Sequence, residues 1–396
     1  MSAGRVRLGL ERLLEDPALL AGRRFAVLAN QASVTSGLVP AWRALGAVGG
    51  RLLRIFAPEH GLWGVAQDME AVVEEREPVL GLPVISLYGT SAETLAPRPE
   101  HLADLDALVV DLPDVGCRYY TFAASLAHVM TACEKAGVEV IVCDRPNPLG
   151  GLTVEGGPVE VGCRSFVSEL PVPVRHGMTL GELALLVRAT RHPDLALSVL
   201  PCSGWRRESW WDQTDLPWVA PSPNMPTLLT ATIYPGACLV EGTNLSEGRG
   251  TARPFQLIGA PWLNGERLAA RLATFAPPGV GFRPAFFRPA FGKHVGQVCA
   301  GVEWHVADRA LLRPVETGVQ LLAEVRAMHP GEFAWRREAY EFVSDVPAID
   351  LLTGSDRARA VIEGRADASG LFGAWASYCE GFREDRRGFL LYPETG

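Results

Sequence analysis

The chain has 396 residues, more than one hydrophobic core usually serves, so its length predicts two domains. Apolar residues make up 48% and charged residues 21% of the sequence, a balance typical of folded globular proteins and not of disordered ones. The formal net charge of -8, without a dense block of lysine or arginine, argues against nucleic acid or an anionic membrane as the partner.

The amino-terminal segment, residues 1–22, is amphipathic and carries acidic residues, so it lacks the continuous apolar stretch of a secretory signal. Only FAVLAN follows Arg23 and Arg24, which indicates a first strand and not a twin-arginine signal. No run of about 18 apolar residues occurs, so no membrane-spanning helix is predicted. The 8 cysteines form no Cys-x-x-Cys pair and are expected to be reduced core residues. These features predict a cytoplasmic protein.

Short apolar runs bounded by turn residues recur in the first half of the chain, and each is predicted to be a buried parallel strand. Segments with helical spacing separate them, notably 119–137, where Gly137 is expected to end a helix. Strands that alternate with helices predict an α/β domain, with a parallel sheet of the Rossmann type and helices on both faces. The predicted strands are 24–30, 51–58, 83–89, 105–113 and 138–146.

The second half of the chain follows a different pattern. A loop rich in proline and glycine extends from about 144 to 180, and a helix is expected to begin with Thr179 as its cap and Glu182 completing a capping box. From about 250 the strands become longer, as in 296–309, and helices are expected at 313–327 and 370–386. We therefore predict a catalytic domain over 1–250 and a smaller C-terminal α+β domain over 251–396.

Polar residues gather after the predicted strands, where open α/β sheets bind their ligands. Glu59 follows the second strand in the segment APEHG. A carboxyl group partly shielded there has a raised pKa and is suited to general acid catalysis, although such a glutamate also often braces a loop by pairing with arginine. The densest polar segment, EGTNLSEGRGT, contributes Glu241 and Glu247 as further candidate catalytic carboxylates.

The remaining polar residues are candidates for substrate binding. Tyr119 and Tyr120 are suited to packing against a sugar ring, and Arg145 and Arg249 to holding a substrate carboxylate through two hydrogen bonds. Asp114, just before the predicted helix, could equally be a helix cap. The long loop mixes charged and amide side chains, which favours a functional role. The predicted binding residues are His60, Asp114, Arg118, Tyr119, Tyr120, Asp144, Arg145, Asn147, Glu155, His176, Asn224, Asn244 and Arg249.

Several cofactor motifs are absent from the sequence. The first strand is followed by NQASVTSG, without the GxGxxG turn of dinucleotide-binding proteins, and neither a phosphate loop nor a GxSxG elbow occurs. His60 and His176 lack the spacing of zinc ligands. A nicotinamide-dependent enzyme is therefore disfavoured, and neither a cofactor nor a metal ion is predicted.

The segments APEHGLWG, DLPDVGCRYYT, DRPNPLGG, VRHGMTLGELA, PSPNMPT and EGTNLSEGRGT occur in this order and resemble the signature of the NamZ-type exo-β-N-acetylmuramidases. The resemblance extends from GLERLL to the terminal FLLY. It implies a Rossmann-like domain joined to a smaller α/β domain. It also implies hydrolysis of terminal β-1,4-linked N-acetylmuramic acid (MurNAc) from the non-reducing end of peptidoglycan fragments, with Glu59 as the catalytic acid. The loops at 114–120, 144–155, 224 and 241–249 would line one cleft.

Two questions stay open at this point. The second catalytic group is Glu241, Glu247 or Asp114, or else the acetamido group of the substrate itself, since substrate-assisted enzymes need no protein nucleophile. The alternative function is a protein of the same fold that binds an amino sugar or a muropeptide without cleaving it.

Overall fold

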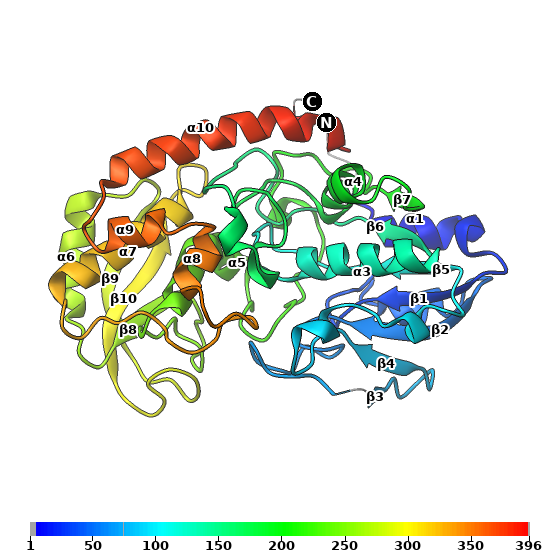
Figure 1. The fold of residues 1–396 in the computed structure, drawn as a ribbon, viewed down its shortest axis with the longest axis horizontal. Helices are drawn as coiled ribbons and strands as arrows, with labels where there is room; N and C mark the ends of the chain where they lie inside the picture. The colour runs from blue at the N-terminus through cyan, green and yellow to red at the C-terminus, as the bar shows by residue number, and fades with distance from the viewer. Residues whose placement is uncertain (1–4, 74, 395–396) are drawn as a thin grey trace.

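The computed structural model describes residues 5–73 and 75–394, so residues 1–4 of the amino-terminal segment lie outside the described residues. Figure 1 shows two lobes, one built around a parallel sheet and a smaller one around a second sheet. The larger sheet has 7 strands in the order β3-β4-β2-β1-β5-β6-β7. These are β1 (Arg24–Leu28), β2 (Arg51–Ala57), β3 (Glu75–Arg76), β4 (Pro83–Ser86), β5 (Ala107–Val110), β6 (Glu139–Cys143) and β7 (Leu197–Leu200).

Neighbouring strands of this sheet pair in parallel, except for the short β3, which runs antiparallel to β4. The five predicted strands are confirmed as β1, β2, β4, β5 and β6. The sequence did not indicate β7, because it lies at the edge of the sheet and all its residues are only partly buried, so no continuous apolar run marks it. The chain order reverses between β1 and β5, which is where such sheets bind ligands.

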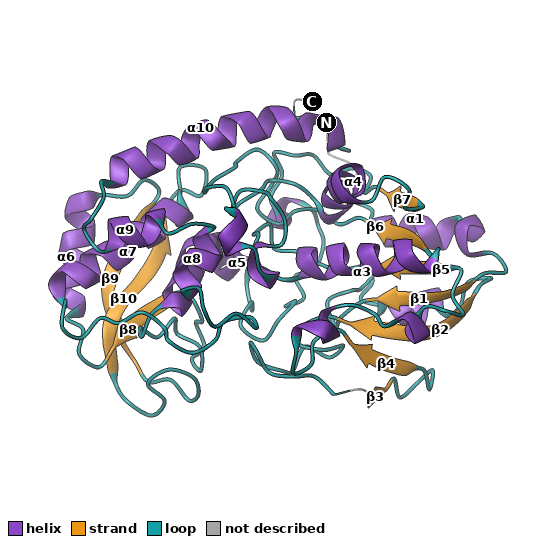
Figure 2. Cartoon of the chain, viewed as in Figure 1, coloured by secondary structure: helices purple, strands orange, loops and turns teal. Residues whose placement is uncertain are grey.

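Helices cover both faces of the sheet, as predicted (Figure 2). Successive residues of a strand point to opposite faces, so Val27 packs towards α1 (Gly9–Glu15) and α2 (Ala41–Leu45), whereas Leu28 packs towards α3 (Phe122–Ala136) and α4 (Leu180–Arg191). Gly137 adopts the left-handed conformation, with φ of 67°, and ends α3. The Thr179 side chain accepts from the Glu182 backbone N–H at the start of α4, which confirms the predicted capping box.

The smaller lobe contains a three-stranded antiparallel sheet in the order β8-β10-β9. Its strands are β8 (Leu257–Ala260), β9 (Val280–Phe287) and β10 (Cys299–Val306). Helix α6 (Gly265–Phe275) packs on this sheet and contacts α7 (Pro314–Met328), which the sequence predicted. Two short helices, α8 (Ala348–Thr353) and α9 (Arg357–Ile362), follow, and the predicted carboxyl-terminal helix is α10 (Ala368–Arg386).

Several contacts join the two lobes. Helix α5 (Leu228–Ala237) packs against α7 so closely that a Cβ on Gly236 would lie 1.8 Å from the carbonyl oxygen of Pro314, which only glycine allows. Helix α10 runs along both lobes (Figure 1). Beyond it the chain returns to the larger lobe, where the Tyr392 hydroxyl donates to Asp144 Oδ2 at 2.6 Å. The last residues therefore complete the larger lobe.

The eight cysteines all lie in the described part of the chain, where each is buried and free of a disulfide, as predicted. Among the helices of the described residues, none is long and apolar enough to cross a membrane.

Candidate active site

A pocket with about 420 Å³ of empty space, including the part open to solvent, brings together residues from both lobes. The larger lobe contributes the loop after β2 and the start of α3, and the smaller lobe contributes the segment between α7 and α8. The pocket is lined by Glu59, His60, Asp68, Tyr119, Tyr120, Thr121, Val167, Ser222, Asn224, Met225, Tyr234, Glu241, Arg249, Phe255, Tyr340 and Glu341.

Glu59 lies just beyond the end of β2 and is only 4% exposed. Its Oε2 accepts a hydrogen bond from Thr121 Oγ1 at 2.6 Å, and its Oε1 accepts from the backbone N–H of Met69 at 3.3 Å. Thr121 is the N-cap residue of α3, so the carboxyl group also faces the positive end of that helix. No arginine or lysine pairs with Glu59 within the described residues, so the ion pair of the predicted loop brace is not formed.

A second carboxyl group, Glu341, enters the same pocket from the smaller lobe. It is 5% exposed, and the Tyr88 hydroxyl donates to its Oε2 at 2.8 Å. Burial, and then the nearby charge of Glu59, raises the pKa of Glu341 well above 4.5. Glu341 therefore tends to keep its proton in the folded protein.

Backbone strain is concentrated around these two carboxyl groups. Positive φ angles, which non-glycine residues rarely adopt, occur at His60 (71°), Met69 (58°), Phe255 (63°), Glu341 (46°) and Phe342 (67°). Such conformations persist only where the surrounding structure enforces them, and they cluster at active sites. The strain supports a functional role for this pocket.

Arg249 is surrounded by carboxylates of the protein itself. Its guanidinium lies 2.7 Å from Glu241, 3.3 Å from Asp68 and 3.5 Å from Glu247. Burial lowers the pKa of Arg249, but these three carboxylates outweigh it and raise the pKa above its ordinary value. Burial likewise opposes the ionisation of Glu241, yet Arg249 and the Tyr340 hydroxyl hold its pKa below 4.5. Arg249 is thus engaged within the protein, and Glu241 is ionised.

The other predicted residues of the pocket have defined orientations. The His60 ring is held by Nδ1, 3.0 Å from the carbonyl oxygen of Ala66, and the Asn224 side chain donates to Gln67 Oε1 at 2.8 Å. Both predicted tyrosines are buried at the pocket wall. The predicted residues that line the pocket are Glu59, His60, Tyr119, Tyr120, Asn224, Glu241 and Arg249.

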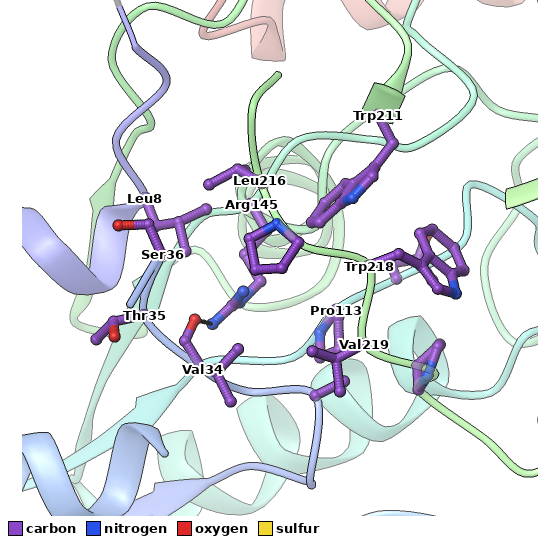
Figure 3. Close-up of a pocket in the computed structure, with 14 residues that line it drawn as sticks. Leu8, Val34, Thr35, Ser36, Pro113, Arg145, Trp211, Leu216, Trp218 and Val219 are labelled. Atoms are coloured by element: carbon purple, nitrogen blue, oxygen red, sulfur yellow. Dashed lines mark hydrogen bonds between the residues drawn. The ribbon is translucent and has the colours of Figure 1, made fainter. Parts of the chain in front are cut away.

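Arg145 lies elsewhere, in a second pocket at the point where the order of the sheet reverses (Figure 3). Its guanidinium donates to Asp111 at 2.7 Å and 2.8 Å and to the carbonyl oxygen of Val34 at 2.7 Å. Figure 3 shows Trp211 and Trp218 on the opposite side of this crevice. Because Asp111 already accepts both hydrogen bonds of the Nε and Nη2 edge, that edge is not available for the predicted grip on a substrate carboxylate.

Further predicted binding residues are also held by groups of the protein and lie outside the lining of the Glu59 pocket. Arg118 donates to the carbonyl oxygens of residues 157, 172 and 352 and so links the two lobes. Asn147 donates to the Met178 carbonyl oxygen. The predicted residues outside the pocket lining are Asp114, Arg118, Asp144, Arg145, Asn147, Glu155, His176, Asn244 and Glu247.

Asp114 and His176 form a buried pair, with Oδ2 and Nε2 3.7 Å apart. Burial raises the pKa of Asp114 to about 7. Burial, followed by the charges of Arg386 and Arg118, lowers the pKa of His176 to about 3. Asp114 accepts from the Gly116 backbone N–H, so it stabilises a turn and does not cap α3.

Glu155 accepts a hydrogen bond from the backbone N–H of Glu316, in the first turn of α7, and burial raises its pKa to about 8. The folded chain therefore binds one more proton than the unfolded chain between pH 4.5 and 8, so this contribution to stability is complete below pH 4.5 and is lost as the pH rises through 8. In Glu155→Gln, we expect the free energy of unfolding to fall less steeply over pH 5 to 8, by about 1 kcal/mol per pH unit.

Urea denaturation at several pH values measures this slope. Glu160→Gln is the matched control, because Glu160 is an exposed glutamate of the same loop and should leave the slope unchanged. A slope in Glu155→Gln equal to that of the unmodified protein would mean that Glu155 is ionised in the folded state.

Several residues of the pocket were not predicted from the sequence, namely Asp68, Thr121, Ser222, Tyr234, Phe255, Tyr340 and Glu341. Thr121 adjoins the predicted Tyr119 and Tyr120, and its place before a helix could have identified it. No strand end or motif marks Glu341. Within the described residues, no cluster of three or more His, Cys, Asp or Glu side chains is placed to hold a metal ion.

Known proteins resemble this chain over nearly its whole length. Residues 25–229 and 232–392 match the N-terminal and C-terminal models of the exo-β-N-acetylmuramidase NamZ. The chain is 38% identical over 390 residues to the peptidoglycan β-N-acetylmuramidase NamZ of Bacillus subtilis (strain 168). This match covers 98% of this chain and 92% of that protein.

Two solved structures of DUF1343 family proteins from Bacteroides fragilis NCTC 9343 share the fold. One has a TM-score of 0.89 and 32% identity, the other a TM-score of 0.75 and 27% identity, and each comparison covers 98% of this chain and 99% of the other. On the evidence of both family models and the Bacillus relative, this chain belongs to the NamZ exo-β-N-acetylmuramidase family.

Proposed function

We propose that this protein is a glycoside hydrolase that releases terminal β-1,4-linked MurNAc from the non-reducing end of peptidoglycan fragments, with Glu59 as the general acid. The observation that carries the proposal is the placement of Glu59 and Glu341 in one pocket. Glycoside cleavage requires one protonated and one ionised group at the reacting bond. Two carboxyl groups in one pocket, one of them with a raised pKa, can supply this charge state.

The substrate class is supported by the Bacillus subtilis relative, which is named a peptidoglycan β-N-acetylmuramidase and shares nearly the whole chain. A MurNAc-containing saccharide or muropeptide is accordingly the proposed partner. The cytoplasmic location expected from the sequence stays a prediction.

In the proposed reaction, Glu59 donates its proton to the glycosidic oxygen while the bond from that oxygen to C1 breaks, and the aglycone leaves as an alcohol. For this step the proton that burial favours on Glu341 first passes to Glu59, which leaves Glu341 as the carboxylate of the pair. It accepts a proton from the group that attacks C1, whether that group is water or the acetamido group of the substrate. Thr121 and Tyr88 orient the two carboxyl groups through their hydrogen bonds.

The carboxylates first considered as the second catalytic group have other partners. Glu241 accepts from both Arg249 and Tyr340, and Glu247 accepts from Lys293 at 3.0 Å. We propose that these two residues position Arg249 and the loop that carries it and do not react. Glu341 replaces Glu241 and Glu247 as the proposed second catalytic group.

The purified protein, tested with 4-nitrophenyl glycosides of MurNAc and of N-acetylglucosamine (GlcNAc), decides between the functions. We expect nitrophenol release from the MurNAc glycoside. Cleavage of the GlcNAc glycoside alone would contradict the proposed specificity. Thermal stabilisation by both sugars without turnover of either glycoside would instead support the non-catalytic binding protein.

A further inference from the structure

Arg336 belongs to the segment between α7 and α8 that also carries Glu341, and it lines a pocket separate from that of Glu59. Its Nη2 is 3.5 Å from the sulfur of Met69, and its guanidinium lies 5.2 Å from the centre of the Tyr340 ring. Met69 in turn donates its backbone N–H to Glu59, and Tyr340 directly precedes Glu341. Met69 therefore connects Arg336 to Glu59, and Tyr340 connects it to the segment that carries Glu341.

Arg336 forms no close ion pair with a carboxylate among the described residues, and the only carboxylate on which its charge acts is that of the exposed Glu338. Its buried Nε has no hydrogen-bond partner, and Nη2 reaches only the Met69 sulfur and the carbonyl oxygen of Ala339 at 3.4 Å. Arg145 and Arg249, by contrast, have their donors directed at carboxylates of the protein. An arginine with an unpaired, partly buried guanidinium at the edge of a pocket is suited to receive an anion from a ligand.

The pocket itself would repel an anionic ligand without such a cation. Glu59, Asp68, Glu241 and Glu341 line it, and the one arginine among its lining residues, Arg249, is neutralised by its own carboxylate partners. A substrate that carries a carboxylate therefore needs a separate positive group at the place where that carboxylate enters. Arg336 provides one.

We infer that Arg336 binds the carboxylate of the lactyl group of MurNAc and so selects MurNAc over GlcNAc. The inference rests on the proposed function. MurNAc differs from GlcNAc by the lactyl ether at O3, and a single ring carbon separates C3 from the reacting C1. The lactyl carboxylate is thus held close to the reacting bond, as Arg336 is held close to Glu59 through Met69.

The geometry of the guanidinium suits this ligand. The two terminal nitrogens, Nη1 and Nη2, lie on one edge of the planar group and can donate two parallel hydrogen bonds to a carboxylate. The Tyr340 ring supports the face of the guanidinium and fixes its plane. Lysine supplies the charge without the planar fork, so Arg336→Lys should recover only part of the selectivity.

The test compares a 4-nitrophenyl MurNAc glycoside with the same glycoside whose lactyl carboxylate is a methyl ester. We expect the unmodified protein to prefer the acid by about 10- to 100-fold in kcat/KM, since a hydrogen-bonded charge contributes at this scale. In Arg336→Gln, kcat/KM for the acid should fall, mainly because KM increases. The values of kcat/KM for the acid and the ester should then differ by less than about threefold. Arg337→Gln is the control, because Arg337 is the exposed neighbour.

Equal losses on acid and ester in Arg336→Gln would overturn the inference. Circular dichroism checks that the variant is folded, and Arg336→Lys gives the same comparison of substrates if the glutamine variant is not. Failure of the proposed function would look different, because the unmodified protein would then release nitrophenol from neither substrate. In that case calorimetric titration with free MurNAc tests Arg336 directly, and equal affinity of the unmodified protein and Arg336→Gln would overturn the inference.

Discussion

Glu59→Gln should bind a MurNAc glycoside but cleave it at least 100-fold more slowly than the unmodified protein, because general acid catalysis commonly contributes 10² to 10⁴ in rate. The effect should depend on the leaving group. A saccharide aglycone leaves as a strong base and needs the proton, whereas 4-nitrophenolate leaves readily without it. The loss should therefore be large for a MurNAc disaccharide and much smaller for the 4-nitrophenyl glycoside.

Steady-state kinetics with both substrates measures this difference. Glu70→Gln is a suitable control, because Glu70 is an exposed glutamate of the same loop and only accepts from the Gln67 backbone N–H. Activity of Glu59→Gln on the disaccharide within about threefold of that of the unmodified protein would refute the assignment of Glu59 as the acid. If the loss depended on the leaving group only in Glu341→Gln, Glu341 would be the acid and Glu59 the base.

Glu341→Gln should lose on the order of 10² or more in rate with both good and poor leaving groups, because the missing base acts on the attacking group and not on the departing one. The pH dependence of the residual activity should also change sign between the two variants. With Glu59 alone the required form is protonated, so activity falls as the pH rises. With Glu341 alone the required form is ionised, so activity increases as the pH rises.

Rates of both variants over pH 4 to 9 test these opposite trends. Glu338→Gln, a change in an exposed glutamate of the same segment, should retain the bell-shaped profile expected for the intact pair. The same pH trend in Glu59→Gln and Glu341→Gln would mean that the two groups do not divide the roles of acid and base.

The sequence predicts those elements of the fold whose burial is visible in their own residues. Buried parallel strands such as β1 and β5 must be apolar on both faces, so their runs are visible in the sequence. Glu59 could be predicted for the same reason, because it follows such a run at the edge of the sheet where ligands bind. The edge strand β7 has no such constraint, and nothing in its sequence marked it.

The rest of the site depends on contacts between distant segments. Glu341 and Arg336 belong to a stretch without strand or helix, and only the packing of the two lobes brings them to Glu59. Arg145 is the opposite case, because its position after a strand predicts a ligand-binding residue but its side chain pairs within the protein. Sequence alone does not tell whether its donors meet a substrate or, as here, Asp111 and a backbone carbonyl.

The hydrogen bond from Tyr392 to Asp144 joins residues 248 positions apart. A ribosome adds roughly 5 to 20 residues each second, so on the order of 10 to 50 s separate the synthesis of the two partners. During that interval the loop after β6 is without the hydroxyl that holds its buried aspartate. The larger lobe therefore lacks this contact until the segment around Tyr392 has been synthesised.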